Sequence, residues 1–127
     1  MKPKKPAAPP KHVKSAIGEK LVKAADENRL KQLKELLGAR TIVVDYQKEN
    51  SWSALLSACH EGHEVAVRML LEAKAKVDLQ SKHGCYALYL ACEDRHLGCM
   101  RLLLKANATI GLRDQGGETA LQVAKRD

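Results

Sequence analysis

The sequence predicts an all-α fold in which helix–turn–helix units stack into a solenoid and are joined by short hairpin-like loops. A seven-residue pattern recurs every 33 residues, at Ser53–Cys59, Tyr86–Cys92 and Thr119–Lys125. Each copy contains A-L-x-x-A, and the first two copies continue into a second apolar segment. Self-similarity with a period of about 20 to 50 residues is typical of repeat proteins. About three and a half repeats fit in the 127 residues.

The first repeat, at about residues 14–47, is the most degenerate copy. Small and apolar residues between Leu21 and Leu37 have the helical period and predict its two helices. Gly38 ends the second helix, and the loop that follows is longer than in the other repeats. We expect residues 41–44 to form a packed loop, with a short strand as the alternative. A terminal repeat is often atypical because it caps the stack.

The second and third repeats, at about residues 48–80 and 81–113, each predict one helix pair. Ser53 is a favourable N-cap for the inner helix of the second repeat. Its outer helix is expected at residues 64–72, because apolar residues there share one helical face. The face residues in the two repeats are Val65, Met69 and Leu70, then Cys99, Leu102 and Leu103.

The last repeat, at residues 114–127, supplies one inner helix without an outer partner. We expect that the sequence was cut from a longer array. A single helix that serves as the cap of the stack is the alternative.

The pattern resembles the ankyrin repeat, D-x-x-G-x-T-P-L-H-x-A-A-x-x-G-H followed by an apolar helix, over residues 14–127. The resemblance implies a non-enzymatic protein–protein interaction module without a cofactor. Nothing in the sequence argues for an enzyme, because a nucleophile elbow, a phosphate-binding loop and a metal motif are all missing. The matching residues are Leu55, Ala58, Gly62 and His63, then Gly84, Leu88 and Ala91, then Asp114, Gly117 and Thr119.

Three slots depart from the family pattern, and we therefore expect modest stability. Alanine replaces the proline that is preorganised for the first helical position. The motif histidine, with its hydrogen bonds, is missing from every copy. The glycine slot that ends the outer helix holds less suitable residues. The residues in these slots are Ala54, Ala87 and Ala120, then Leu56, Tyr89 and Gln122, then Lys74 and Asn107.

The four cysteines are interpreted as unpaired thiols. Cys59 and Cys92 occupy the same repeat slot and should be small core residues, Cys99 lies on an apolar helix face, and Cys85 lies near a loop tip. Free thiols suit a reducing compartment, so we expect an intracellular protein, cytoplasmic or nuclear. The alternative is a metal site, which we reject because equivalent repeat positions are displaced along the stack. Its ligands would be Cys59, His60 and His63, or Cys92, His96 and Cys99.

The net charge of +7 belongs mainly to the N-terminal tail. Residues 1–14 contain five lysines and no acid, which leaves 17 basic and 15 acidic residues in the rest of the chain. Four prolines favour an extended or disordered tail over residues 1–13. The tail is either a solubilising leader or a weak contact for nucleic acid, acidic lipid or acidic protein.

The resemblance also implies which residues bind a partner, namely the loop tips and the exposed side of the inner helices. The loop-tip residues are Gln47, Glu49, Asn50 and Trp52, then Gln80, Lys82, His83 and Cys85, then Arg113, Gln115, Gly116 and Glu118. The inner-helix residues are Asp26, Glu27, His60, Glu61, Glu93 and Asp94.

Five of these six inner-helix residues are acidic, so we expect an acidic row on the concave face and a basic opposite face. Ordinary solvated helix ends are the alternative reading of the row. The leading hypothesis is a monomeric interaction module that binds a basic peptide or protein surface. The alternative hypothesis is a nucleic-acid- or chromatin-associated protein that uses the lysine-rich tail. Trp52 is the strongest single candidate, because aromatic anchors dominate interface energies.

Overall fold

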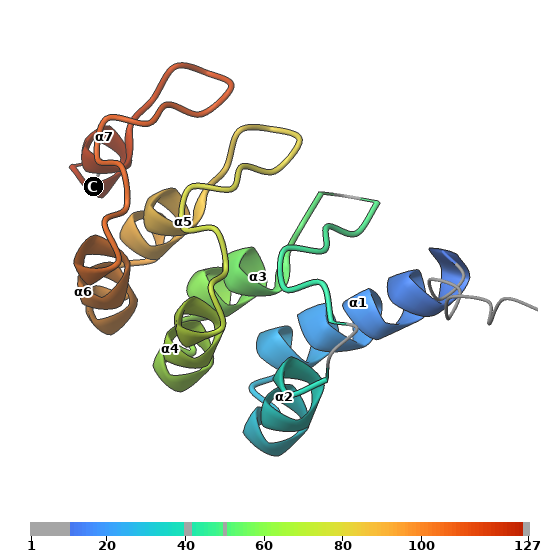
Figure 1. The fold of residues 1–127 in the computed structure, drawn as a ribbon. Helices are drawn as coiled ribbons and strands as arrows, with labels where there is room; N and C mark the ends of the chain where they lie inside the picture. Colours follow the sequence, from blue (N-terminus) through green and yellow to red (C-terminus); the bar gives the residue numbers. More distant parts are fainter. Residues whose placement is uncertain (1–10, 40–41, 50, 126–127) are drawn as a thin grey trace, which may run out of the picture.

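The computed structural model describes the backbone of residues 11–39, 42–49 and 51–125, and side chains from Ala16 onward within these ranges. Seven helices and the loops between them make up this part of the chain (Figure 1). The helices are α1 (Lys11–Asp26), α2 (Leu30–Leu37), α3 (Ala54–Glu61), α4 (Glu64–Glu72), α5 (Ala87–Glu93), α6 (Leu97–Lys105) and α7 (Ala120–Ala124).

The helices form two parallel rows. The inner row is α1, α3, α5 and α7, and each of these helices packs on the next. The outer row is α2, α4 and α6, and each outer helix also packs on the inner helix of its own repeat. Figure 1 shows the helix pairs side by side, with the hairpin loops of successive repeats projecting on the same side of the stack. The predicted all-α solenoid is confirmed.

The hairpin-like loops contain almost no sheet. In the described residues, β pairing is limited to an isolated bridge between Arg113 and Thr119. Ile42 and Val43 have no regular structure and Val44 lies in a turn, as a packed loop requires. Ile42 and Val44 are partly buried against the core. Thr41 lies outside the described residues.

Several helix ends follow directly from local chemistry. The Ser53 hydroxyl accepts a hydrogen bond from the backbone N–H of Leu56 at 3.3 Å, which caps α3. Thr119 and Gln122 form a capping box at the start of α7. Lys74 and Asn107, which fill the glycine slot after the outer helices, are left-handed, with φ of 69° and 67°. The end of the outer helix predicted there is confirmed.

The N-terminal boundary differs from the expected one. Helix α1 begins at Lys11, whereas the sequence predicted an extended or disordered tail over residues 1–13. The segment from Lys11 has no proline, and prolines are confined to the first ten residues. Helix formation can therefore begin as soon as the last proline has passed.

The core is thin and mainly aliphatic, because the chain has one tryptophan, three tyrosines and no phenylalanine. Leu21, Leu33, Leu56, Leu70 and Leu103 are fully buried and run through all three helix pairs. Alanine and cysteine fill the narrow spaces between neighbouring helices. Each repeat thus buries its apolar face against the next repeat.

The four cysteines are free. Cys59, Cys92 and Cys99 are buried, as predicted, and Cys85 is only half-buried. Burial raises the pKa of the Cys59 thiol well above its usual value, and the nearby Cys99 adds to this. Burial, with a contribution from Glu64, raises the pKa of Cys99 to about 11. These thiols are therefore packing residues that stay protonated at neutral pH.

Side chains tie consecutive loops together at the repeat spacing. Gln47 Nε2 donates to the carbonyl of Gln80 at 3.0 Å, and Gln80 Nε2 donates to the carbonyl of Arg113 at 2.9 Å. Asp45 and Asp78 accept from backbone N–H groups one repeat further on, at 2.8 and 2.9 Å. The ladders fix the spacing of the loops that the expected partner surface uses.

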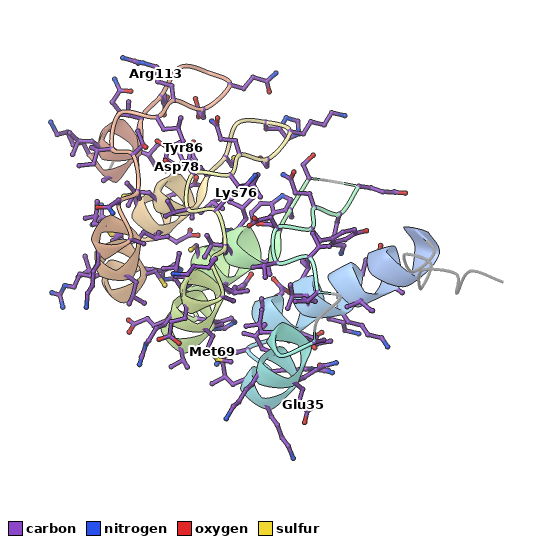
Figure 2. All side chains as sticks on the ribbon, viewed as in Figure 1. Glu35, Met69, Lys76, Asp78, Tyr86 and Arg113 are labelled. Atoms are coloured by element: carbon purple, nitrogen blue, oxygen red, sulfur yellow. The ribbon has the colours of Figure 1, made fainter. Side chains whose placement is uncertain are left out.

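Tyr86 provides a further link between repeats. Its side chain is fully buried in the slot that holds Ser53 and Thr119 in the neighbouring copies. The hydroxyl donates to the carbonyl of Leu112 and accepts from the backbone N–H of Ala120 at 3.0 Å. Tyr86 thereby joins the third repeat to α7, and Figure 2 shows it between α5 and the last hairpin.

Candidate partner-binding surface

Some of the predicted loop-tip residues are engaged within the solenoid. Gln47 and Gln80 also close their own loops by donating to the carbonyls of Ser51 and Gly84, at 2.8 and 2.9 Å. Together with the links described above, both side-chain amides serve the loop framework. Asn50, another predicted residue, lies outside the described residues. The sequence placed Gln47 and Gln80 correctly in the loops, but their hydrogen bonds could not be predicted from it.

The last two hairpin tips support each other. The backbone N–H of Gln115 donates to the carbonyl of His83 at 3.1 Å, and the two side chains meet at 3.4 Å. Gly84 has φ of 80°, and a side chain there would lie only 2.4 Å from the backbone nitrogen of Gln115. Glycine is therefore required for this close approach. The tips at residues 83 and 115 form one continuous rim.

Other candidate residues on the rim differ in accessibility. Glu49, Lys82 and Gly116 are exposed, and the exposed Arg113 donates to the carbonyl of Gly117 at 2.7 Å. Glu118 is half-buried, and its backbone N–H donates to Asp114 at 2.8 Å.

Cys85 is the least buried of the four thiols. Its backbone N–H donates to the Ser81 hydroxyl at 3.2 Å, which holds it in the hairpin. Partial burial raises the pKa of the thiol, with smaller contributions from Glu93 and Asp114, although a hydrogen bond with Ser81 lowers it. The raised pKa disfavours the thiolate, so Cys85 is the most accessible of the four thiols but is not activated.

Trp52 borders a hollow between α1 and α3. The hollow has a volume of about 520 Å³ and combines apolar and charged walls. Trp52 is half-buried, and its ring meets the His60 ring edge-on, with centroids 5.4 Å apart and planes inclined by 69°. The lining residues are Glu19, Val22, Lys23, Asp26, Lys48, Trp52, Ser57 and His60.

His60 connects this hollow to the acidic residues of the next repeat. Its Nδ1 lies 3.1 Å from a carboxylate oxygen of Asp94, and its Nε2 lies 3.9 Å from Glu61. Glu27 is paired with Arg29 at 2.6 Å. The acidic row, comprising Asp26, Glu27, Glu61, Glu93 and Asp94, is exposed throughout.

The acidic row lies at an unfavourable place for helix stability. Its members are the last residues of α1, α3 and α5 or follow these helices directly. Carboxylates near a helix C-terminus face the negative end of the macrodipole, which costs about 0.3–1 kcal/mol each at exposed sites. Local helix energetics therefore disfavour these acids, and a cationic partner would relieve the repulsion.

The opposite side carries a basic excess rather than a uniform basic face. Arg40, another base of the sequence segment after α2, lies outside the described residues. Three exposed acids, Glu35, Glu64 and Glu72, interrupt the bases. Figure 2 shows Glu35 and Met69 at the end of the molecule opposite to Arg113. The exposed bases are Lys31, Lys34, Arg68, Lys74, Lys76, Arg101 and Lys105.

His63 and His96, which were considered as metal ligands, form hydrogen bonds between repeats. His63 Nε2 donates to the carbonyl of Asp26 at 2.9 Å, and His96 Nε2 donates to the carbonyl of His60 at 3.0 Å. Each histidine joins an outer helix to the inner helix of the preceding repeat. In the described part of the chain, no group of three His, Cys, Asp or Glu side chains could hold a metal ion.

Five of the eight residues that line the hollow were not predicted from the sequence as site residues, namely Glu19, Val22, Lys23, Lys48 and Ser57. Glu19, Val22 and Lys23 come from α1, whose repeat is too degenerate to mark them as surface positions. Their i, i+3, i+4 spacing, continued by Asp26 at i+7, was the available signal, because it places them on one helical face. Lys48 was next to predicted tip residues and could have been included.

Comparison with known proteins identifies the family. A family model described as ankyrin repeats, in three copies, matches residues 21–114. A comparison with curated proteins gave no match. None of the helices in the described residues is both long and apolar enough to span a membrane. Ankyrin repeats are generally protein–protein interaction modules and typically non-enzymatic. With three matched copies over most of its length and a confirmed helical solenoid, the chain belongs to the ankyrin repeat family.

Proposed function

We propose that the chain binds a basic peptide or basic protein surface along its concave side. The hollow beside Trp52 is the observation that carries this proposal, because an aromatic wall and carboxylates are combined there in an open depression. Aromatic side chains with both apolar and polar contacts are enriched at interface anchor points. The inner-helix ends and the hairpin rim supply the rest of the surface.

The acidic row supports a cationic partner. Its members lie at the helix ends where the macrodipole disfavours them, and consecutive repeats bring Asp94 to within 3.1 Å of His60. A partner with spaced lysine or arginine side chains would neutralise this charge. Long-range attraction would also accelerate association and make the affinity depend on salt.

The hollow itself favours one anchoring side chain over a dense run of cations. Glu19 and Asp26 are accompanied by Lys23 and Lys48 on its walls, so its charges balance. An arginine or lysine can place its apolar stem against Trp52 and direct its charge toward a carboxylate. Binding of this kind gives a defined register in addition to general charge attraction.

A charge-reversal pair tests this proposal. A blocked arginine-rich peptide is titrated into the chain while the fluorescence of Trp52, the only tryptophan, is recorded. The double variant Glu61→Lys, Glu93→Lys should weaken binding by about tenfold or more, equivalent to 1.4 kcal/mol. The matched control is Glu35→Lys, Glu72→Lys on the outer helices, which changes net charge equally. Equal losses in both variants would mean that only net charge matters.

The free thiols support an intracellular location, cytoplasmic or nuclear, and we propose that the chain acts there as a monomer.

The alternative function is nucleic-acid binding through the lysine-rich tail, because five lysines and no acid precede residue 15. Removing residues 1–10 would abolish binding to a DNA duplex under that alternative. It would leave the arginine-rich peptide bound under the first proposal.

A further inference from the structure

His60 lies where the hollow beside Trp52 meets the acidic row. Its ring forms part of the wall of the hollow, and the ring centroid lies 5.4 Å from that of Trp52. Its Nδ1 lies 3.1 Å from a carboxylate oxygen of Asp94 in the next repeat. The His60 side chain is 46% exposed, so that both solvent protons and a partner can reach it. A change in the charge of this ring therefore affects the hollow and the acidic row together.

Neutral His60 leaves the hollow open to a cation. In this form one ring nitrogen carries a hydrogen, and Nδ1–H can donate to Asp94 without adding any charge. Two acidic and two basic side chains line the hollow, so that its walls carry no net charge. The arginine or lysine of a basic partner then meets no additional positive charge beside Trp52.

Protonated His60 takes the place that the cation of the partner would occupy. The contact of Nδ1 with Asp94 becomes a charge-assisted hydrogen bond, and Nε2 faces Glu61 at 3.9 Å. The positive ring also lies within about 6 Å of the Trp52 ring, the range in which aromatic rings attract cations. The hollow gains one positive charge, and two members of the acidic row are paired with a cation of the chain itself.

Other charged residues surround His60 on the elements that pack on α3, namely on α1, on α4, on the loop before α3 and at the end of α5. They are Glu19, Lys23, Asp26, Lys48, Glu64, Arg68, Glu72, Glu93, Asp94 and Arg95. Those of α1 and the loop line the hollow, whereas those of α4 do not. His96 donates through Nε2 to the carbonyl of His60 at 3.0 Å and so contacts its backbone. The charged contacts of the His60 ring are thus with Asp94 and Glu61.

His60 is also the kind of residue that changes its charge near neutral pH. Histidine ordinarily gains or loses its proton between about pH 5 and 8, whereas carboxylates and lysine ammonium groups ordinarily keep their charge near pH 7. His63 and His96 are bonded to backbone carbonyls, and His83 meets the neutral amide of Gln115. Among the histidine side chains that the structure describes, pairing with the acidic row is limited to His60.

We infer that His60 is a proton-operated switch of the concave surface: a basic partner binds while His60 is neutral and is released when His60 is protonated. The inference rests on the proposed function, because it concerns the same hollow and the same acidic row. Proton and partner compete, so by linkage the binding of the partner also expels the proton. A modest fall in pH weakens the complex while the carboxylates of the row remain ionised.

The fluorescence of Trp52 tests the charge change in the chain alone. An imidazolium close to an indole quenches its emission, and Trp52 is the only tryptophan. Emission should fall as the pH is lowered from about 8 to about 6, and this fall should be absent in His60→Gln. His83→Gln is the matched control, because it removes an exposed histidine at the rim and should leave the fall in place. Emission that does not depend on pH, or an equal fall in His60→Gln, would overturn the inference.

Binding of the partner is tested with the blocked arginine-rich peptide, which has no group that titrates in this range. Calorimetry with the full chain at constant ionic strength should give an affinity about tenfold lower at about pH 6 than at about pH 8. His60→Gln should remove most of this difference. Two buffers of different ionisation enthalpy should show that binding releases protons from the unmodified chain.

The same titration separates the inference from the proposed function. Binding at about pH 8 with an equal affinity at about pH 6 would overturn the inference and leave the proposed function in place. No binding at either pH would overturn the proposed function and the inference with it.

Discussion

Tyr86 shows how one side chain can take over a role that the repeat pattern assigns to smaller residues. The hydroxyls of Ser53 and Thr119 cap their own helices, whereas the Tyr86 hydroxyl reaches Leu112 and Ala120 in the next repeat. Tyr86 therefore does not cap its own helix, α5, but forms hydrogen bonds that connect two repeats. Its burial against Tyr89 adds an aromatic contact with ring centroids 5.8 Å apart.

Replacing Tyr86 by phenylalanine keeps the ring and removes the link. The variant leaves the Leu112 carbonyl and the Ala120 N–H without their partner, which should cost about 1–3 kcal/mol of unfolding free energy. The loss is measured by denaturant unfolding and by amide exchange. Exchange should accelerate at residues 119–124 and not at residues 54–61. Unchanged exchange at α7 would show that Tyr86 does not hold it.

The thiols offer a second test at the residue scale. Cys85 should react first with a neutral thiol reagent, because Cys59, Cys92 and Cys99 are buried and free. Burial raises the pKa of Cys99 from 9.0 to about 11, so the folded state favours the protonated thiol. This stabilisation is complete below about pH 9 and is lost as the pH rises toward 11. Mass mapping that finds Cys59 labelled before Cys85 would contradict the assignment.

At the scale of the element, the sequence predicted those structural features that recur with the 33-residue pattern. The helix pairs and their order, the buried cysteines and the left-handed slots at Lys74 and Asn107 all depend on repetition. Features that occur once were missed. The start of α1 at Lys11 and the Glu19 side of the hollow lie in the degenerate first copy. The Tyr86 link joins residues that do not occupy equivalent positions in the repeats. Such features depend on tertiary contacts that no single repeat encodes.

Lys74 provides a direct test of a helix end. With φ of 69°, this lysine lies in the left-handed region, where its Cβ is sterically unfavourable. Glycine has no Cβ and adopts this conformation without that penalty. Lys74→Gly should therefore be neutral or stabilising by up to about 1 kcal/mol. Thermal unfolding measures the change, with Lys76→Gly as the control outside the left-handed slot. Strong destabilisation by Lys74→Gly would mean that the conformation at this position differs.

At the scale of the whole molecule, the chain combines a rigid framework with an unusual placement of charge. The glutamine, aspartate and histidine links set the spacing of the loops and helix ends, so that the presented surface is preorganised. Preorganisation lowers the entropic cost of binding an extended partner. The acidic row is therefore held at regular intervals, which suits a partner with regularly spaced cations.

The central claim is that a basic partner lies along the concave side beside Trp52. Amide and indole shifts of the isotopically labelled chain, recorded during titration with the arginine-rich peptide, test it most directly. The account predicts shifts at the Trp52 indole, at residues 57–61 and at residues 93–94, all reduced at high salt. Shifts confined to α2, α4 or α6, with an unchanged Trp52 indole, would contradict it.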